Sequence, residues 1–352
     1  MTYQGVLHRY KNLLDLPAHS KEVSLLEGDT PLIPMPRLGK ELGCELFIKF
    51  EGLNPTGSFK DRGMTAAISE AAGRGAETVI CASTGNTAAS AAAYAARAGL
   101  RAIVLIPEGK VAIGKLAGAI AYGAEVIQVR GSFDDALSLV VEITQKTPIA
   151  LVNSINPYRI EGQKTAAFEI CDVLGKAPDW LCLPVGNAGN ITSYWAGFKQ
   201  YQRGLPRILG VQAEGAAPLV LGHPVDKPET IATAIRIGKP ARGEQALQAA
   251  QESNGKIIAV TDEAILSAQR LLAAEGVWVE PASAAGLAGL IAEAGKGPAL
   301  SGVEASGVEA RGKRVVAVCT GHGLKDPSIV TESFQSPKIV PATYEALVSA
   351  IE

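Results

Sequence analysis

The sequence is poor in residue types that several classes of protein need. Only 5% of its 352 residues are aromatic, which disfavours a stacking platform for nucleic-acid bases. The 33 basic side chains nearly balance the 35 acidic ones, so no overall field attracts a polyanion, and nucleic acid is not expected as a partner. Hydrophobic residues still make up 47% of the chain, which is ample for a core, and the length favours about two domains.

Cysteine and histidine are too few and too scattered for a metal site or a disulfide framework. The five cysteines include no C-x-x-C pair, and the four histidines form no cluster beside them. Cys81, Cys182 and Cys319 lie inside apolar runs, which favours buried, reduced thiols. The N-terminus has no apolar signal-peptide core, so we expect a cytoplasmic protein without a bound metal.

Long uninterrupted hydrophobic segments are missing as well. Two long stretches without charge, 78–96 and 180–198, are each broken by a polar, glycine-containing turn, at 83–87 and at 186–190. Turns of this kind could not sit in lipid, because their backbone groups would lack hydrogen-bond partners. The sequence therefore predicts no membrane association.

Short apolar runs alternate with stretches of helical pattern along most of the chain. This alternation predicts parallel sheets with crossover helices, and strands buried on both faces are apolar almost throughout. The predicted strands cover 78–83, 101–107, 125–129, 149–154, 180–185, 208–214, 256–262 and 314–319. Helices are predicted up to Gly99, over 112–122, 132–146, 157–174 and 190–203, up to Gly276, and over the closing segment 342–352.

Two of these helices carry recognisable end signals. Ser132 and Asp262 precede helical patterns and are residue types that cap a helix N-terminus, while Gly276 is placed to end the second helix. Residues 215–255 mix proline, glycine and charge and predict no clear regular structure. The segment 294–313 is rich in glycine and serine and is predicted to be a surface loop or short linker.

In open α/β sheets a ligand binds beyond the carboxyl ends of the strands, so the residues that directly follow each apolar run are informative. The turn 83–87, with the sequence STGNT, joins a predicted strand to a predicted helix. Its hydroxyls and backbone N–H groups face the positive end of the helix dipole, which suits a carboxylate. An ordinary capping turn uses the same residue types, so this motif alone leaves both interpretations open.

A second turn, PVGNAGN at 184–190, also joins a predicted strand to a predicted helix. Its two glycines allow consecutive N–H groups to converge on an oxyanion such as a phosphate monoester. The motif is neither G-x-G-x-x-G nor a P-loop, so dinucleotide and nucleoside triphosphate binding do not follow. In a third turn, CTGHGLKDP at 319–327, Thr320 offers one hydroxyl in a glycine-rich bend, which a plain turn explains equally well.

An isolated lysine, Lys60, lies in the segment FEGLNPTGSFKDRG at 50–63, between turn residues and a predicted helix start. A lysine held near a phosphate-binding turn is what a Schiff base with an aldehyde cofactor requires. Taken alone, a solvated surface charge is the simpler interpretation of this residue.

Together these segments resemble the tryptophan-synthase-β-like, fold-type II pyridoxal-phosphate enzymes, and within that family the threonine synthases. The resemblance rests on six motifs in the family's order, at 28–32, 49–63, 82–99, 153–165, 184–192 and 319–327. It implies an α/β fold with two three-layer α/β/α domains, mostly parallel sheets, and pyridoxal 5′-phosphate in the cleft between them. A small domain over 53–155 would be inserted into a larger one formed by 1–52 and 156–352, and a homodimer is implied.

The resemblance also implies a role for each motif residue. Lys60 would hold the cofactor as a Schiff base and then move protons, which demands a depressed pKa. Asn86 would bond the phenolate oxygen of the cofactor, and Thr320 would face its ring nitrogen. The cofactor phosphate would be cradled by Gly186, Asn187, Ala188, Gly189 and Asn190. The substrate carboxylate would be held by Ser83, Thr84 and Thr87. Glu280 and His322 could lie near the ring or be structural, and neither is assigned a role.

The implied reaction converts O-phospho-L-homoserine and water to L-threonine and phosphate, a carbon–oxygen lyase reaction on a phosphate ester that completes threonine biosynthesis. A second phosphate, on the substrate, distinguishes this reaction from those of related enzymes that share the lysine and the phosphate turn. By resemblance it would be bound by Ser154 and Arg159 together with Lys60, Thr87 and Asn187. A position on a helix surface is the alternative interpretation of Arg159. A serine/threonine dehydratase of the same family, which needs no second anion site, and a non-catalytic regulatory protein that binds the cofactor are the alternative functions.

Overall fold

The computed structural model describes residues 2–109, 113–131, 133–295, 310–327 and 339–351, and its strands form two separate sheets. The larger sheet has the strand order β1-β2-β10-β7-β8-β9. Only β1 runs antiparallel to its neighbour, and all other pairs in this sheet are parallel. Its strands are β1 (Leu32–Pro34), β2 (Glu45–Phe50), β7 (Trp180–Pro184), β8 (Arg207–Ala213), β9 (Lys256–Val260) and β10 (Arg314–Cys319).

The smaller sheet has the order β5-β4-β3-β6 and is parallel throughout. Its strands are β3 (Thr78–Ala82), β4 (Arg101–Pro107), β5 (Glu125–Val129) and β6 (Ala150–Leu151). The very short β6 is extended by the side chain of Asn153, which donates to the Ala82 carbonyl and accepts from the Ala82 N–H, both at 2.9 Å. This reciprocal pair holds the chain after β6 beside the chain after β3.

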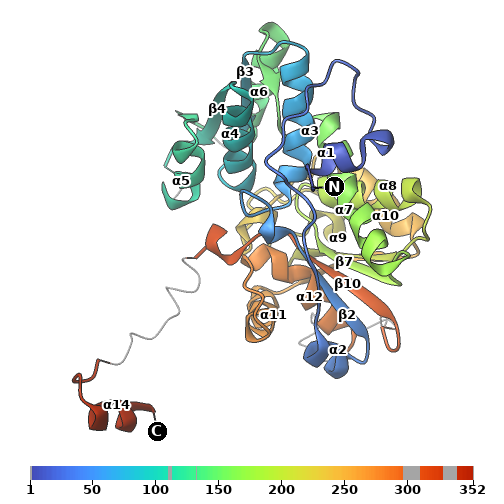
Figure 1. Cartoon of the computed structure of the whole chain (residues 1–352), viewed down its shortest axis with the longest axis vertical. Coiled ribbons are helices and arrows are strands. Elements are labelled where there is room, and N and C mark those ends of the chain that lie inside the picture. The colour runs from blue at the N-terminus through green and yellow to red at the C-terminus, as the bar shows by residue number, and fades with distance from the viewer. Residues whose placement is uncertain (1, 110–112, 132, 296–309, 328–338, 352) are drawn as a thin grey trace.

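Helices cover both sheets, and Figure 1 shows β3, β4 and α4 to α6 at one end of the molecule, with β2, β7, β10 and α12 toward the other. The α-helices are α1 (Val6–Arg9), α2 (Pro36–Leu42), α3 (Lys60–Gly73), α4 (Asn86–Ala98), α5 (Ile113–Ala121), α6 (Phe133–Lys146), α7 (Pro157–Leu174), α8 (Gly189–Tyr201), α9 (Pro218–Leu221), α10 (Gly243–Glu252), α11 (Asp262–Ala274), α12 (Pro281–Glu293) and α14 (Tyr344–Ile351). Short 3-10 helices are η1 (Lys11–Leu13), η2 (Glu51–Leu53), η3 (Thr233–Ile235) and η4 (Gly323–Lys325).

Each sheet has its own buried core. One core packs β2, β8 and β10 against α11 and α12, through side chains such as Ile48, Val211 and Leu287. A second core packs β3 and β4 against α3 and α4, through side chains such as Val104 and Tyr94. The strands of the smaller sheet fall inside the predicted insertion at 53–155, and its boundaries remain a prediction.

Helices α3 and α7 approach each other so closely that glycine is required at the crossing. A Cβ added to Gly162 of α7 would lie 1.8 Å from the backbone oxygen of Arg62 in α3. A Cβ added to Gly63 would lie 2.7 Å from Nε of Arg159. The absence of these two methyl groups therefore brings the helix that begins at Lys60 against the helix that carries Arg159.

Most predicted elements are present, and α7 covers the predicted residues 157–174. One cap prediction is wrong: Thr261, not Asp262, caps α11, because its hydroxyl accepts a hydrogen bond from the N–H of Ala264. Gly276 follows that helix in the left-handed region, with φ of 87°, as predicted. The predicted cap Ser132 and most of the predicted loop 294–313 lie outside the described residues.

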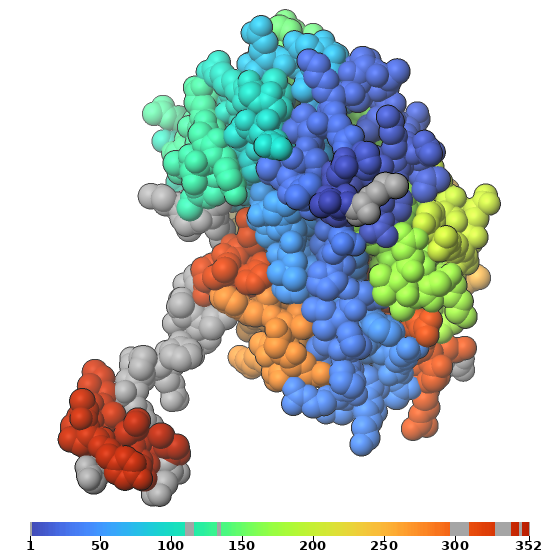
Figure 2. All heavy atoms as spheres, viewed as in Figure 1, coloured from blue at the N-terminus to red at the C-terminus, as the bar shows by residue number. Residues whose placement is uncertain are grey.

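The α-helices α1, α2, α9, α10 and α12 were not predicted, and α9 and α10 lie within 215–255. The closing helix α14 is present and stands apart from the body of the molecule (Figure 2). Among the described helices, none is long and apolar enough to span a membrane. All five cysteines are free, and the three predicted to be buried, Cys81, Cys182 and Cys319, are buried.

Candidate active site

Lys60 is the first residue of α3, and its charge is coupled to those of Arg159 and Glu280. Its ammonium lies 4.4 Å from the centroid of the Phe59 ring, and its side chain is only partly exposed. Burial, together with the positive charge of Arg159, lowers the pKa of Lys60 to about 7, and the opposite charge of Glu280 resists this shift. An amine with such a pKa is available in its neutral form near pH 7, as a nucleophile or a base requires.

Arg159, in the first turn of α7, is 1% exposed. One guanidinium nitrogen donates to the Val152 carbonyl at 2.8 Å, while its Nε is buried without a partner. Within the described residues it forms no ion pair, and burial lowers its pKa to about 10. A buried guanidinium without a carboxylate partner is costly, so this geometry favours an anionic ligand as the missing partner.

The turn between β3 and α4 contributes a cluster of partly exposed polar residues. Ser83 follows the strand directly, and its hydroxyl accepts from the N–H of Gly85 at 3.3 Å. Thr84 lies in this turn and Thr87 in the first turn of α4, and neither side chain forms a hydrogen bond within the described residues. Their hydroxyls at the N-terminus of α4 are available to an external carboxylate.

Asn86, the first residue of α4, contacts Glu280, a residue next to a helix that packs on the larger sheet. Its amide donates to both carboxylate oxygens of Glu280, at 3.0 and 3.1 Å. Glu280 precedes α12, is 4% exposed, and has its pKa raised by burial. An amide has two N–H groups, so Asn86 can keep one bond to Glu280 and donate the other to a ligand.

The turn between β7 and α8 has the geometry of an anion cradle. Ala188 adopts the left-handed conformation with φ of 63°, and α8 begins at Gly189 without a side-chain cap. The first N–H groups of a helix lack intrahelical acceptors, so at the N-terminus of α8 they are free to donate to a bound anion. The side-chain amide nitrogen of Asn190 is buried without a hydrogen-bond partner. A Cβ added to Gly189 would meet nothing within 4 Å.

Asn187 joins this cradle to the smaller sheet. Its amide nitrogen donates to the Ser154 hydroxyl at 2.9 Å, and its amide oxygen accepts from the N–H of Ala241 at 2.7 Å. Two of the five residues that the resemblance assigns to the substrate phosphate are therefore in direct contact, although they follow strands of different sheets.

Thr320 follows β10 and is held by a residue that the sequence did not assign. Its hydroxyl lies 2.9 Å from the hydroxyl of Ser283 in α12, which also accepts from the N–H of Gly321 at 2.8 Å. The Thr320 carbonyl accepts from the N–H of Phe59 at 2.9 Å, which ties this turn to the start of α3. Thr320 and Lys60 are therefore fixed relative to one another through the backbone.

The structure distinguishes Glu280 from His322, the two residues to which the sequence assigned no role. Glu280 belongs to the site, because it bonds Asn86 and its charge acts on Lys60. His322 stacks on Phe50, with ring centroids 5.9 Å apart, and also contacts Trp278. Its Nδ1 accepts from the N–H of Leu324, so the ring is engaged in packing and capping the short helix η4.

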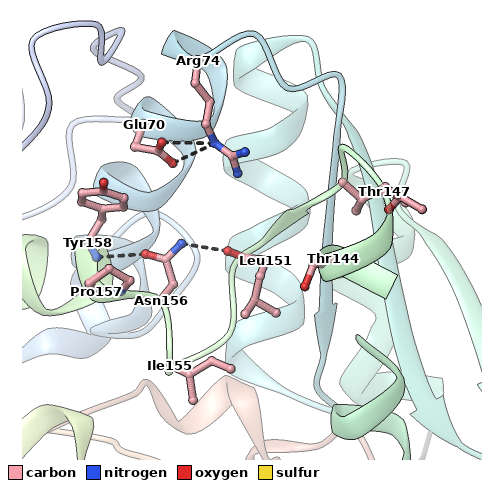
Figure 3. Close-up of a pocket in the computed structure, with 10 residues that line it drawn as sticks. Glu70, Arg74, Thr144, Thr147, Leu151, Ile155, Asn156, Pro157 and Tyr158 are labelled. Carbon is pink, nitrogen blue, oxygen red and sulfur yellow. Dashed lines mark hydrogen bonds and ion pairs between the residues drawn. The ribbon is translucent and has the colours of Figure 1, made fainter. Parts of the chain in front are cut away.

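A cavity of about 470 Å³ lies elsewhere, between α3, α6 and the start of α7 (Figure 3). Glu70 pairs there with Arg74, and Asn156 donates to the Leu151 carbonyl and accepts from the N–H of Tyr158. Thr144 donates to a carbonyl of its own helix. Because these polar groups are already bonded within the chain, this cavity offers a ligand little compared with the cluster around Lys60.

Residues 23–321 match the family of pyridoxal-phosphate dependent enzymes. The chain belongs to this family. It is 54% identical to a threonine synthase of Halalkalibacterium halodurans, over 99% of this chain and 98% of the relative, and 56% identical to one of Synechocystis, over 94% and 86%. A solved threonine deaminase from Solanum lycopersicum shares the fold, with a TM-score of 0.73, 23% identity and 95% coverage of both chains. The predicted tryptophan-synthase-β-like fold class is confirmed.

The residues of the chain fit pyridoxal phosphate, the cofactor of this family. Lys60 supplies a half-buried amine of lowered pKa, as bonding to an aldehyde requires. The unpartnered amide of Asn190 and the open space at Gly189 leave room for a phosphate at the N-terminus of α8. These features are what the cofactor's aldehyde and phosphate need.

We expect Lys60 of the cofactor-free protein to titrate near pH 7, and to titrate at higher pH in Arg159→Gln, because the variant removes a like charge. The rate at which an amine-reactive reagent modifies the Lys60 peptide, followed against pH by mass spectrometry, measures this midpoint. Arg74→Gln, outside the site, should leave the midpoint unchanged. A wild-type midpoint near that of an ordinary lysine, or an equal midpoint in Arg159→Gln, would contradict the electrostatic account.

Proposed function

We propose that the chain has threonine synthase activity and converts O-phospho-L-homoserine and water to L-threonine and inorganic phosphate. The observation that carries this proposal is Arg159, a buried guanidinium with an unpartnered Nε whose charge acts on Lys60. A substrate with its own phosphate supplies the missing anion, whereas serine or threonine does not. Curated relatives named threonine synthase, 52–57% identical over nearly the whole chain, support the same activity.

When bound, pyridoxal phosphate supplies a conjugated ring that delocalises negative charge from the carbons of an amino acid. We assign its phosphate to Gly186, Asn187, Ala188, Gly189 and Asn190. Asn86 would donate to its phenolate oxygen, while Glu280, which accepts from the same amide in the structure, would orient it. Thr320, whose hydroxyl lies beside that of Ser283, would face the ring nitrogen. Because that partner is a hydroxyl and not a carboxylate, the ring nitrogen is not forced to be protonated, which limits transamination.

Lys60 is the proton carrier of the proposed reaction. With a pKa of about 7, its amine is substantially neutral at physiological pH and can accept the Cα proton. The same group can then deliver a proton, since the two forms are close in free energy. Ser83, Thr84 and Thr87 hold the substrate carboxylate at the N-terminus of α4, where the helix dipole favours negative charge.

The leaving phosphate is assigned to Arg159, Ser154 and Asn187, completed by Lys60 and Thr87. The phosphate satisfies the unpartnered Nε of Arg159, and planar guanidinium groups bind phosphate oxygens in pairs. A bound dianion also offsets the repulsion between Arg159 and the protonated amine of Lys60. Substrate is thereby held with its reacting carbons over the Lys60 amine.

The activity itself is tested by incubating the cofactor-loaded protein with O-phospho-L-homoserine. We expect L-threonine and inorganic phosphate to appear in equal amounts. Lys60→Ala should abolish both products together with the visible absorbance that the cofactor gains on bonding to the lysine. Phosphate release without threonine would refute the proposed activity, and an unchanged spectrum in Lys60→Ala would remove Lys60 from its role.

The second phosphate site is tested by comparing two substrates. We expect Arg159→Ala to cost about 2–5 kcal/mol in kcat/KM for O-phospho-L-homoserine, the range for stripping one partner from a buried charge pair. Deamination of L-serine, which has no phosphate, should change much less in the same variant. An equal loss for both substrates would favour the dehydratase alternative, because Arg159 would then have a role unrelated to a phosphate.

We further infer that the protein works in the cytoplasm as a homodimer whose inserted domain, 53–155, closes over the cofactor. Exposed apolar side chains on α14 support an interface, with Tyr344 79% and Ile351 74% exposed. Buried free cysteines suit a reducing compartment.

The dimer is tested by sedimentation equilibrium, which should give twice the mass of the chain. The double variant Tyr344→Ser, Ile351→Ser should shift the protein toward the monomer. A wild-type protein that remains monomeric at all concentrations would contradict the dimer.

A further inference from the structure

The segment that leads into α10 reaches the site from a region whose sequence predicts no regular structure. Ala241 donates its N–H to Asn187 at 2.7 Å, and the next residue, Arg242, directs its Nε at the backbone oxygen of Ser154, 3.4 Å away. Arg242 therefore lies beside Ser154 and Asn187, two of the residues assigned to the leaving phosphate.

The charge of Arg242 is uncompensated. Its side chain is half-buried, and within the described part of the chain its guanidinium forms no ion pair with a carboxylate. Burial lowers the pKa of Arg242, and no neighbouring charge contributes to the shift. In the same segment, Arg236 lies 3.7 Å from Glu229 and has the ordinary pairing of a surface arginine. Arg242 shares with Arg159 the feature that marks an anion site.

The contact with Ser154 does not explain the arginine. At 3.4 Å it is long for an N–H···O hydrogen bond and contributes little. The segment is already fixed by the shorter bond between Ala241 and Asn187. A shorter or neutral side chain at position 242 would leave that bond intact, so the guanidinium is not needed to hold the loop.

We propose that Arg242 is a specificity-determining residue that binds the phosphate group of the substrate, as a second guanidinium in addition to Arg159. The proposal rests on the proposed function, since it concerns the same phosphate. A phosphate dianion offers acceptors to both guanidinium groups, and charge-assisted bonds of this kind are the strong ones. The cofactor phosphate is the other possible source of the anion. We commit to the substrate because Arg242 contacts Ser154, which follows β6, and not the first turn of α8.

The test compares Arg242→Gln, which keeps a donor but loses the charge, with Arg242→Lys, which keeps the charge. We expect Arg242→Gln to raise the KM for O-phospho-L-homoserine about 10- to 100-fold, the range for one charged hydrogen bond, with a much smaller change in kcat. Inhibition by inorganic phosphate should weaken by a similar factor. Arg242→Lys should recover most of both losses. Arg236→Gln, on the same segment but paired with Glu229, should behave like the wild type.

Two further measurements separate the sources of the anion. The dissociation constant of pyridoxal phosphate, from titration of the cofactor-free protein, should be unchanged in Arg242→Gln. Deamination of L-serine should also be unchanged. A weaker cofactor affinity with an unchanged KM would assign Arg242 to the cofactor and overturn the proposal.

Equal losses for both substrates, or equal losses in Arg242→Lys and Arg242→Gln, would show a structural role and also overturn the proposal. If wild-type protein released no phosphate from O-phospho-L-homoserine, the proposed function itself would fail. A fully active wild type with an unaffected Arg242→Gln would refute only the role of Arg242.

Discussion

The site depends on a buried network of charges that fixes the start of α3. Arg62, two residues after Lys60, donates to Glu51 at 2.6 Å and to Glu169 at 2.6 and 2.8 Å, and Lys49 donates to Glu169 at 2.7 Å. Two cations thus face two carboxylates, and the four residues come from β2, η2, α3 and α7. Such a network tolerates no loss of a single partner, since the remaining charge would be buried alone. It therefore fixes α3, and with it Lys60, against α7 and the larger sheet.

The contrast between Arg62 and Arg159 separates structure from function. Each is 1% exposed, so burial alone does not distinguish them. The carboxylates of Glu169 and Glu51 hold the pKa of Arg62 well above its usual range, whereas burial lowers the pKa of Arg159 to about 10. The first guanidinium forms ion pairs within the chain, whereas among the described residues the second forms none and is only partly compensated by the charge of Asp61. A cation buried without an ion-pair partner lowers the free energy of unfolding, and binding of an anionic ligand restores that stability.

Local patterns predicted the parts of the fold that local forces decide. Alternating apolar runs located the parallel strands, and the helical pattern predicted over 157–174 coincides with α7, which Asn156 caps and Pro157 begins. Helix α12 escaped prediction because it is apolar on all sides and buried, so it shows no amphipathic period. The bond between Asn86 and Glu280, 194 positions apart, and the Ser283–Thr320 pair depend on how distant segments meet, which no short motif encodes. The role of Arg242 was not predicted for the same reason, because its place beside Ser154 depends on how two distant segments meet.

Polar links between the two sheets explain how substrate can organise this site. Asn187 and Ser154, which follow strands of different sheets, bond directly at 2.9 Å. Both belong to the group assigned to the leaving phosphate, so an anion placed there accepts from both side chains in place of their mutual bond. In this proposal the link between the sheets would run through the anion, which would also bind the guanidinium of Arg159. A substrate without a phosphate leaves the direct bond in place and the guanidinium unpartnered. Under the proposed function, the phosphate would therefore contribute binding energy at the same point at which it links the two sheets, so that one interaction would supply both selectivity and the closure that we propose.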